Sequence, residues 1–239
     1  MDYFFITLIL FSGALLQGIT GFGSGLLAVP LLSLLLPLSN ITPTLSLVNC
    51  CLTGFLLYQT RHYCDLRQWS ALIVAGVVGS LLGNQYLLSG DTLTLQRGLA
   101  ILVIVTAVCL LSGWRLPLPA TATSKFGVGL LAGFCNGALT LGGPPVVLFL
   151  NQQNIDKQNF RATLSAFFFI IALTNSVSFA LQDQYQLSMS PVLLAMLIGV
   201  IGGVFIGHRI AAMIPELAFK RLTLAVVVGS GLLVLLSSG

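Results

Sequence analysis

The stretch Gln17-Gly-Ile-Thr-Gly-Phe-Gly-Ser-Gly25 interrupts an apolar block that extends over residues 3–38. Each glycine inside a helix costs about 1 kcal/mol relative to alanine, so this stretch is a poor regular helix. The whole block is also too long for one upright helix across a hydrocarbon layer of about 30 Å. The sequence therefore predicts that the block breaks at these glycines and turns back.

The composition excludes a water-soluble globular protein. Of the 239 residues 56% are hydrophobic, mean hydropathy is +1.02, and only 10 Lys or Arg and 6 Asp or Glu are present. So few polar side chains cannot cover a water-facing surface. Apolar blocks lie at 3–38, 43–60, 69–89, 93–113, 125–150, 162–181, 189–214 and 217–237. We predict an all-α polytopic membrane protein that spans a lipid bilayer.

A second interrupted block lies at residues 125–150 and contains Gly142-Gly-Pro-Pro145. It is too short for two full crossings but long enough for a hairpin with its tip between Gly137 and Pro145. Non-helical backbone at membrane depth is tolerated where it is buried in protein or lines a polar cavity. We therefore expect both interrupted blocks to be re-entrant hairpins, each entering and leaving the membrane on one side.

The two halves of the chain form a weak internal repeat. Gly18 and Gly21 with Pro30 answer Gly133 and Gly137 with Pro145, and Thr44-Leu-Ser46 answers Thr163-Leu-Ser165. The pair Gly79 and Gly83 answers Gly203 and Gly207, a spacing that favours close helix packing. Matched repeats are typical of transporters. The predicted units are residues 1–113 and 125–239, joined by a proline-containing linker at 114–124.

The positive charges test the orientation of these repeats. A hairpin plus three crossings is an odd number of crossings, so the second repeat must be inverted relative to the first. With both termini outside, nine of the ten cations are cytoplasmic and only Arg97 is outside, as the positive-inside rule requires. If both interrupted blocks crossed once, the split would be six to four. The charges favour inverted repeats with re-entrant hairpins.

The breaks predict an anion site. Helices that restart after Gly25 and at Pro144 would direct their positive N-terminal ends toward the centre, and neighbouring polar groups would add donors. The candidate substrate-binding residues are Gln17, Thr20, Gly21, Gly23, Ser24, Gly25, Asn49, Asn136, Gly137, Thr140, Gly142, Gly143 and Pro144. The alternative is that the glycines only let a broken helix pair pack tightly.

Arg161 and His208 are the candidate gating or coupling residues. Arg161 lies near the start of a predicted helix, where an arginine in solvent or lipid headgroups is the commoner case and a gate is the alternative. No Asp or Glu lies deep in a predicted span, so a coupling proton would need His208 or a protonatable substrate. A structural role is the commoner one for an interfacial histidine.

The remaining polar residues indicate no catalytic or metal chemistry. Asn84, Gln85 and Asn175 are expected to bond across helices or to face the cavity. Four of the five cysteines lie in apolar stretches without metal-ligand spacing, and for Cys135 packing is favoured over substrate contact. Neither histidine has an acidic partner within the spans. We predict no enzyme, no cofactor, no metal and no nucleic-acid partner.

Two motifs carry a family resemblance. Gly18-Ile-Thr-Gly-Phe-Gly-Ser-Gly25 with Pro30, and the segment from Gly133 through Pro145 followed by Arg161-Ala-Thr163, resemble the glycine-rich signatures of the TauE/SafE sulfite exporter family. The likeness covers nearly the whole chain. The second motif has Leu-Gly-Gly-Pro-Pro where another glycine is common, and the first has Ser24 between two glycines.

The resemblance implies a secondary transporter of sulfite, a sulfonate or a similar sulfur oxyanion in a bacterial inner membrane. The alternatives are an anion channel and a carrier of an unrelated small organic acid. A structural subunit would not need two matched polar breaks. The resemblance specifies neither the direction of transport nor the oligomeric state.

Overall fold

The computed structural model describes residues 2–33, 38–89, 101, 118–153, 155–185, 190–215 and five positions between 218 and 225. The predicted segment 93–113, apart from Ile101, most of segment 217–237, and the start of the linker lie outside this part of the chain. Every regular element in the described part is helical, as predicted. These elements are α1 (Asp2–Thr20), α2 (Ser24–Ser33), α3 (Leu38–Thr60), a 3-10 turn η1 (Arg61–Tyr63), α4 (Ser70–Ser89), α6 (Ala122–Leu139), α7 (Gly143–Gln152), α8 (Lys157–Leu181) and α9 (Ser190–Met213).

The first predicted break occurs between α1 and α2, at residues 21–23. Gly21 has φ +88° and Gly23 has φ +106°, in the left-handed region that glycine adopts without a steric penalty. The N–H of Gly21 closes α1 on the carbonyl of Gln17, at 2.7 Å. Ser24 then lies against Gly13, about halfway along α1. The chain therefore turns back at the glycines, and α2 begins beside the middle of α1.

The second break, at residues 140–142, shares the positive φ of the first break at its first residue but not at its third, where Gly142 has φ −75°. Thr140 has φ +60°, and its N–H closes α6 on the carbonyl of Asn136, at 2.7 Å. Gly142 lies against Ala132 of α6, so the chain turns back here too. The helix α7 then restarts with Pro144 and Pro145 in its first turn, where proline lacks an N–H that would be unpaired anyway. Each residue of α2 precedes its counterpart in α7 by 119 positions, from Ser24 to Gly143. This offset pairs Gly18 with Gly137 and Gly21 with Thr140, so the pairing of Gly18 and Gly21 with Gly133 and Gly137 expected from the sequence is wrong.

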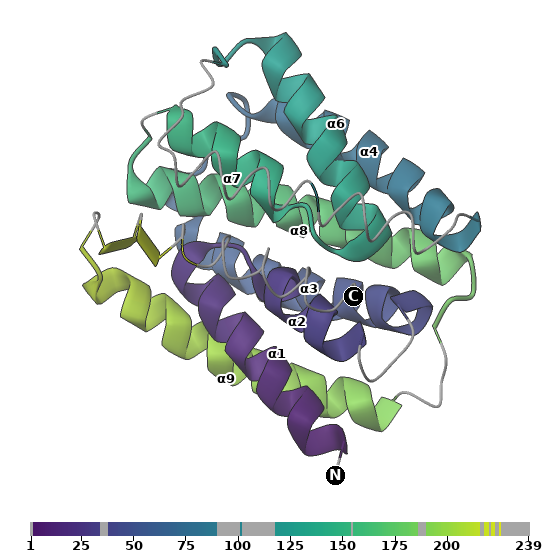
Figure 1. Ribbon diagram of the computed structural model, residues 1–239. Helices are drawn as coiled ribbons and strands as arrows, with labels where there is room; N and C mark the ends of the chain where they lie inside the picture. The colour runs from purple at the N-terminus through teal and green to yellow at the C-terminus, as the bar shows by residue number, and fades with distance from the viewer. Residues whose placement is uncertain are drawn as a thin grey trace.

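Glycines bring two pairs of helices into backbone contact. In the pair α4–α6, a Cβ on Gly133 would lie 2.0 Å from the carbonyl oxygen of Gly76. In the pair α1–α9, a Cβ on Gly203 would lie 2.5 Å from the carbonyl oxygen of Phe11, and one on Gly207 2.3 Å from that of Leu15. A Cβ on Gly79 would lie 2.1 Å from the carbonyl oxygen of Leu130, and one on Gly83 2.3 Å from that of Phe134, so the packing role predicted for Gly79, Gly83, Gly203 and Gly207 is confirmed. Figure 1 shows the two pairs on opposite sides of the bundle, with α3 and α8 between them.

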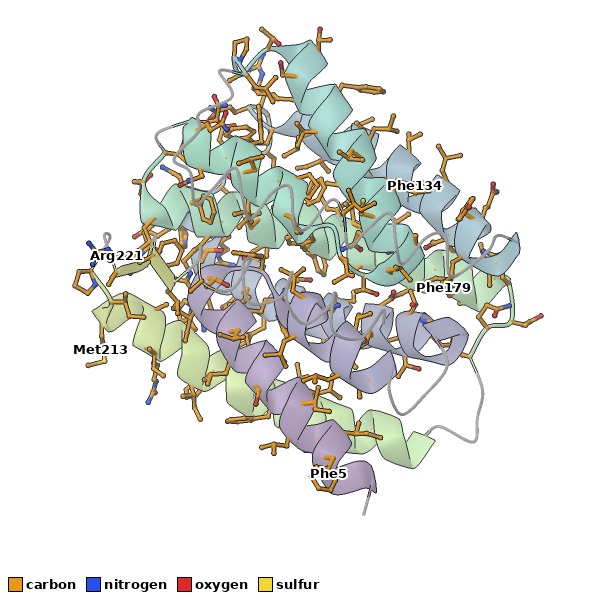
Figure 2. All side chains as sticks on the ribbon, in the orientation of Figure 1. Phe5, Phe134, Phe179, Met213 and Arg221 are labelled. Atoms are coloured by element: carbon orange, nitrogen blue, oxygen red, sulfur yellow. The ribbon has the colours of Figure 1, made fainter. Side chains whose placement is uncertain are left out.

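The outer surface of the bundle is apolar. Phe5 on α1 and Met213 at the end of α9 are 53% and 83% exposed, and Figure 2 shows both side chains pointing away from the bundle. In the described part of the chain, Ser70–Leu88 and Lys157–Leu181 are long and apolar enough to cross a membrane, and Phe5–Thr20 and Val200–Met213 are shorter apolar helices. Such a surface suits contact with lipid.

Candidate functional site

A cavity lies where the two helix breaks meet. The space open to the centre of a water molecule is about 30 Å³, enough for about two water molecules. Its walls come from α1, α2 and α3 on one side and from α6, α7 and α8 on the other. The described lining residues are Gln17, Gly23, Ser24, Gly25, Leu26, Ser46, Asn49, Thr53, Asn136, Thr140, Gly143, Phe168 and Ala172.

Eight of the residues expected to bind substrate line this cavity. They are Gln17, Gly23, Ser24, Gly25, Asn49, Asn136, Thr140 and Gly143. The other five lie close to the breaks but do not line it. Thr20 donates to the carbonyl of Leu16 and contacts that of Phe22. Gly21 packs against Arg161, Gly137 against Ser80, and Gly142 against Ala132, while Pro144 is buried in the first turn of α7.

Five of the lining residues were not predicted from the sequence. Ser46 and Thr53 belong with Asn49 to one face of α3, because they are spaced i, i+3 and i+7. That spacing was the signal that could have found them. Phe168 and Ala172 of α8 lie 119 positions after Asn49 and Thr53, the same offset that relates the two breaks, so extending the internal repeat along α3 would have found these two. Leu26 has an apolar side chain, and no feature of the sequence indicated that it lines the cavity.

The amide oxygens of the cavity wall are all engaged by protein donors. The backbone N–H of Ser24 donates to Oε1 of Gln17, at 3.3 Å, and the Ser24 hydroxyl donates to Oδ1 of Asn49, at 2.7 Å. On the other side, Nδ2 of Asn175 donates to Oδ1 of Asn136, at 3.2 Å. Hydrogen bonds within the described part of the chain leave the NH₂ groups of Gln17, Asn49 and Asn136 unused. These three NH₂ groups are therefore the amide donors that remain for a ligand in the cavity.

The hydroxyl groups on α3 contribute less. The hydroxyl of Ser46 donates to the carbonyl of Thr42, and that of Thr53 donates to the carbonyl of Asn49. Each acceptor lies four residues earlier in α3. A ligand could take these protons only by displacing those bonds. The amides are thus the donors that stand ready in this wall.

The backbone at the two helix starts adds positive potential. The N–H groups in a helix's first turn have no acceptor within the helix, and the helix dipole makes this end positive. The two breaks touch each other directly, since a Cβ on Gly25 would lie 2.2 Å from the carbonyl oxygen of Thr140. Both helix starts therefore face the same small volume, although Pro144 and Pro145 leave α7 with fewer N–H donors than α2.

Thr140 is held in a strained conformation beside the cavity. A β-branched residue at φ +60° is a genuine outlier, and the left-handed conformation costs such a residue about 1–2 kcal/mol. Its hydroxyl is buried and makes no hydrogen bond to any described residue. The corresponding position of the first break is Gly21, which adopts this conformation without the penalty. Strain retained at a cavity wall points to a use for the side chain.

Arg161 is not in solvent or in headgroups, and the commoner assignment made from sequence is wrong. The side chain is 2% exposed, and Nη2 donates to the carbonyl of Gly18, at 2.7 Å. Because α8 already begins at Lys157, Arg161 lies a full turn inside the helix and packs on the first break. Its Nη2 also contacts Nδ1 of His208, at 3.2 Å. Neither residue lines the cavity, and their gating or coupling role stays a prediction.

Two of the residues predicted either to bond across helices or to face the cavity do the former. Asn84 and Asn175 bond to each other across helices, with 3.1 Å between Nδ2 and Oδ1. Cys135 is buried in α6 and does not line the cavity, which agrees with a packing role. The described residues contain no group of three or more His, Cys, Asp or Glu that could hold a metal ion.

Comparison with known proteins gives one family. The family model described as "Sulfite exporter TauE/SafE" matches residues 5–234, which include both breaks and every described helix that lines the cavity. No curated protein and no solved structure matches the chain.

Proposed function

Because the chain belongs to the TauE/SafE sulfite exporter family, we propose that this integral membrane protein carries a small sulfur oxyanion in the cavity between its two helix breaks. The family consists of membrane transporters, and the expected cargo is sulfite, a sulfonate or a similar anion. The expected location is a bacterial inner membrane, with both termini outside, as the distribution of cations favours.

One observation carries the choice of an anion. All three amides in the cavity wall have their oxygens engaged by protein donors, so the groups left for a ligand are NH₂ donors. An oxyanion presents acceptors in every direction and matches such a wall, whereas a metal cation needs oxygen ligands. Hydrogen bonds to a charged partner are about twice as strong as neutral ones. The converging helix starts favour the same sign of charge.

The size and neutrality of the cavity suit a transported ligand. The described lining residues are all uncharged, so the anion would be held by dipoles rather than by an ion pair. Dipoles can stabilise a small anion without a fixed charge that would hold it tightly. The space for about two water molecules limits the buried part of the ligand to a group of sulfite or sulfonate size.

The arrangement of the helices supports alternating access by an inverted repeat. The proposed repeats are residues 1–113 and 125–239, and each contains one re-entrant hairpin. In Figure 1 α1 runs upward from the N-terminus, whereas α6, its counterpart at the second break, runs downward. The pairs α1–α9 and α4–α6 are each held by backbone contact, and the cavity lies between them. Rocking of one pair against the other would open the cavity to each side in turn.

The experiment begins with the purified protein in detergent. Its thermal unfolding is measured with sulfite, sulfate, thiosulfate, methanesulfonate and sulfoacetate, each beside dimethyl sulfone, a neutral analogue with similar oxygens. We expect at least one anion to raise Tm and the neutral analogue to leave it unchanged. Stabilisation by the neutral analogue to the same extent, or by none of the anions, would overturn the assignment of an anion site.

Flux then separates a carrier from a channel. Proteoliposomes preloaded with the stabilising anion are diluted into the same labelled anion, and uptake is followed with time. A carrier shows trans-stimulation, because the loaded site returns faster than the empty one, whereas a channel does not. Uptake without trans-stimulation would replace the proposed carrier with a channel.

A further inference from the structure

A row of three hydrogen-bonded asparagines leads from the buried face of α4 to the cavity. Nδ2 of Asn84 donates to Oδ1 of Asn175, at 3.1 Å, and Nδ2 of Asn175 donates to Oδ1 of Asn136, at 3.2 Å. The three residues belong to α4, α8 and α6, and the first two are 0% exposed. Only Asn136 lines the cavity. We call Asn84, Asn175 and Asn136 the amide relay.

The direction of the amide relay decides what the cavity receives. Each amide has one acceptor end and one donor end, so a bond that engages the oxygen turns the NH₂ group the other way. Since Asn175 donates to the oxygen of Asn136, the NH₂ group of Asn136 is left for the cavity. The opposite direction would present an oxygen, which repels an anion.

Stability alone does not account for the amide relay. Oδ1 of Asn84 is buried and has no partner among the residues that the structure describes. A buried unsatisfied polar atom costs about 1–3 kcal/mol, which an apolar residue at this position would avoid. An amide network that is only partly satisfied is less stable than an apolar core.

The first break shows why the second one needs outside support. There, Ser24 engages the oxygens of both Gln17 and Asn49 through its own backbone and hydroxyl. The counterpart of Ser24 at an offset of 119 is Gly143, which has no side chain, and the counterpart of Gln17 is Asn136, which is one methylene shorter. The oxygen of Asn136 is engaged by Asn175 instead.

We infer that Asn175, held in turn by Asn84, is a positioning residue that keeps the NH₂ group of Asn136 toward the cavity and thereby contributes to its selectivity for anions. This inference rests on the proposed function. Asn175 does not touch the ligand, and it acts through Asn136.

The test compares Asn175→Leu, Asn136→Leu and the double variant, each as full-length protein in proteoliposomes, with sulfite as the labelled anion. Asn175→Leu should raise KM about tenfold with little change in maximal rate, because one oriented donor to a charged ligand is lost. Asn136→Leu should raise KM at least as much. The double variant should be no worse than Asn136→Leu, since residues that act through one group are not additive.

A neighbouring substitution serves as the matched control. Ser176→Ala changes the next residue of α8, which is also buried, and its hydroxyl makes no hydrogen bond to any other described residue, the amide relay included. Its KM should equal that of the unaltered protein. If Asn175→Leu does not purify as a monodisperse species, Asn84→Leu removes only the outer bond and should raise KM about twofold to threefold.

The outcomes separate this inference from the proposed function. Additive effects in the double variant, or an unchanged KM in folded Asn175→Leu or Asn84→Leu, would overturn the positioning role while leaving anion transport in place. If the unaltered protein neither binds nor carries sulfite or any other tested anion, the proposed function fails and the inference fails with it.

Discussion

Both helix breaks turn the chain back on itself, but they do so with different residues. Gly21 and Gly23 let the first break adopt positive φ without strain, and Ser24 orients the neighbouring amides. At the second break Thr140 occupies the left-handed position, and Gly143 stands where the first break has Ser24. The internal repeat therefore preserves the turn and the positive φ at its first residue, whereas the third residue, with φ +106° at Gly23 and −75° at Gly142, and the side chains of each break differ.

The difference extends to the walls behind the breaks. The helix α3 contributes Ser46, Asn49 and Thr53, whereas α8 contributes Phe168 and Ala172 at the corresponding turns. A ligand in the cavity thus meets polar side chains on α3 but apolar ones at the corresponding turns of α8, while Asn136 and Thr140 add polar groups beside the second break. Pseudo-symmetric backbones permit alternating access, but an asymmetric lining lets the site orient a ligand with one polar end.

The largest effect should follow from separating the breaks. Gly25→Ala places a Cβ 2.2 Å from the carbonyl oxygen of Thr140. Because both atoms are attached to backbone, the clash can be relieved only by moving one break away from the other. We expect a loss of about 3 kcal/mol in the free energy of unfolding and no detectable flux. Thermal unfolding and proteoliposome uptake measure the two effects. Gly127→Ala is the control, because a Cβ there meets nothing within 4 Å; it should keep the flux and lose no stability, since alanine is favoured over glycine inside a helix by about 1 kcal/mol.

A smaller effect should follow from loosening only the first break. Arg161→Met removes the bond to the carbonyl of Gly18 while keeping a long side chain. We expect a loss of about 2 kcal/mol in stability and a slower transport rate, because α1 is no longer held where it ends. The counterpart of Arg161 in the first half is Thr42, whose buried hydroxyl has no partner within the described part of the chain. Thr42→Val should leave both stability and transport rate unchanged. Equal effects in the two variants would show that the Arg161–Gly18 hydrogen bond does not hold the end of α1 in place.

The smallest effect, and the most informative, should come from making the second break resemble the first. Thr140→Gly relieves the strain at φ +60° but removes the hydroxyl beside the cavity. Stability should stay within about 1 kcal/mol of the original value while KM for sulfite rises about threefold. Thr140→Asn tolerates the left-handed conformation and keeps a donor, so its KM should stay closer to the original. An unchanged KM in Thr140→Gly would show that the hydroxyl does not reach the ligand.

The positions of both breaks were predictable because glycine and proline act locally. Gly21, Gly23 and the pair Pro144 and Pro145 exclude a continuous helix whatever surrounds them. Residues beside the breaks could be predicted for the same reason, and seven of them line the cavity. The eighth, Asn49, lies on α3 with Ser46 and Thr53, and for these three the rotation of the helix decides which side faces the cavity.

The burial of Arg161 could not be predicted from its neighbours in sequence. Its position near the start of a predicted helix indicated an exposed side chain, but the burial of an arginine depends on which helices pack around it. Gly21 leaves room for Arg161 beside the first break, and the guanidinium of Arg161 donates to the carbonyl of Gly18. The contact joins residues 143 positions apart, which no local pattern indicates.

The sequence by itself determined the helical class, the apolar surface, the family and the two points at which helices must stop, because hydropathy and backbone freedom belong to individual residues. Only the tertiary structure decided that the breaks touch, that Arg161 is buried on the first of them, and which end of each amide is left for the cavity. Those features depend on hydrogen bonds between distant helices. An asparagine can present either its oxygen or its NH₂ group, and its neighbours in space select which.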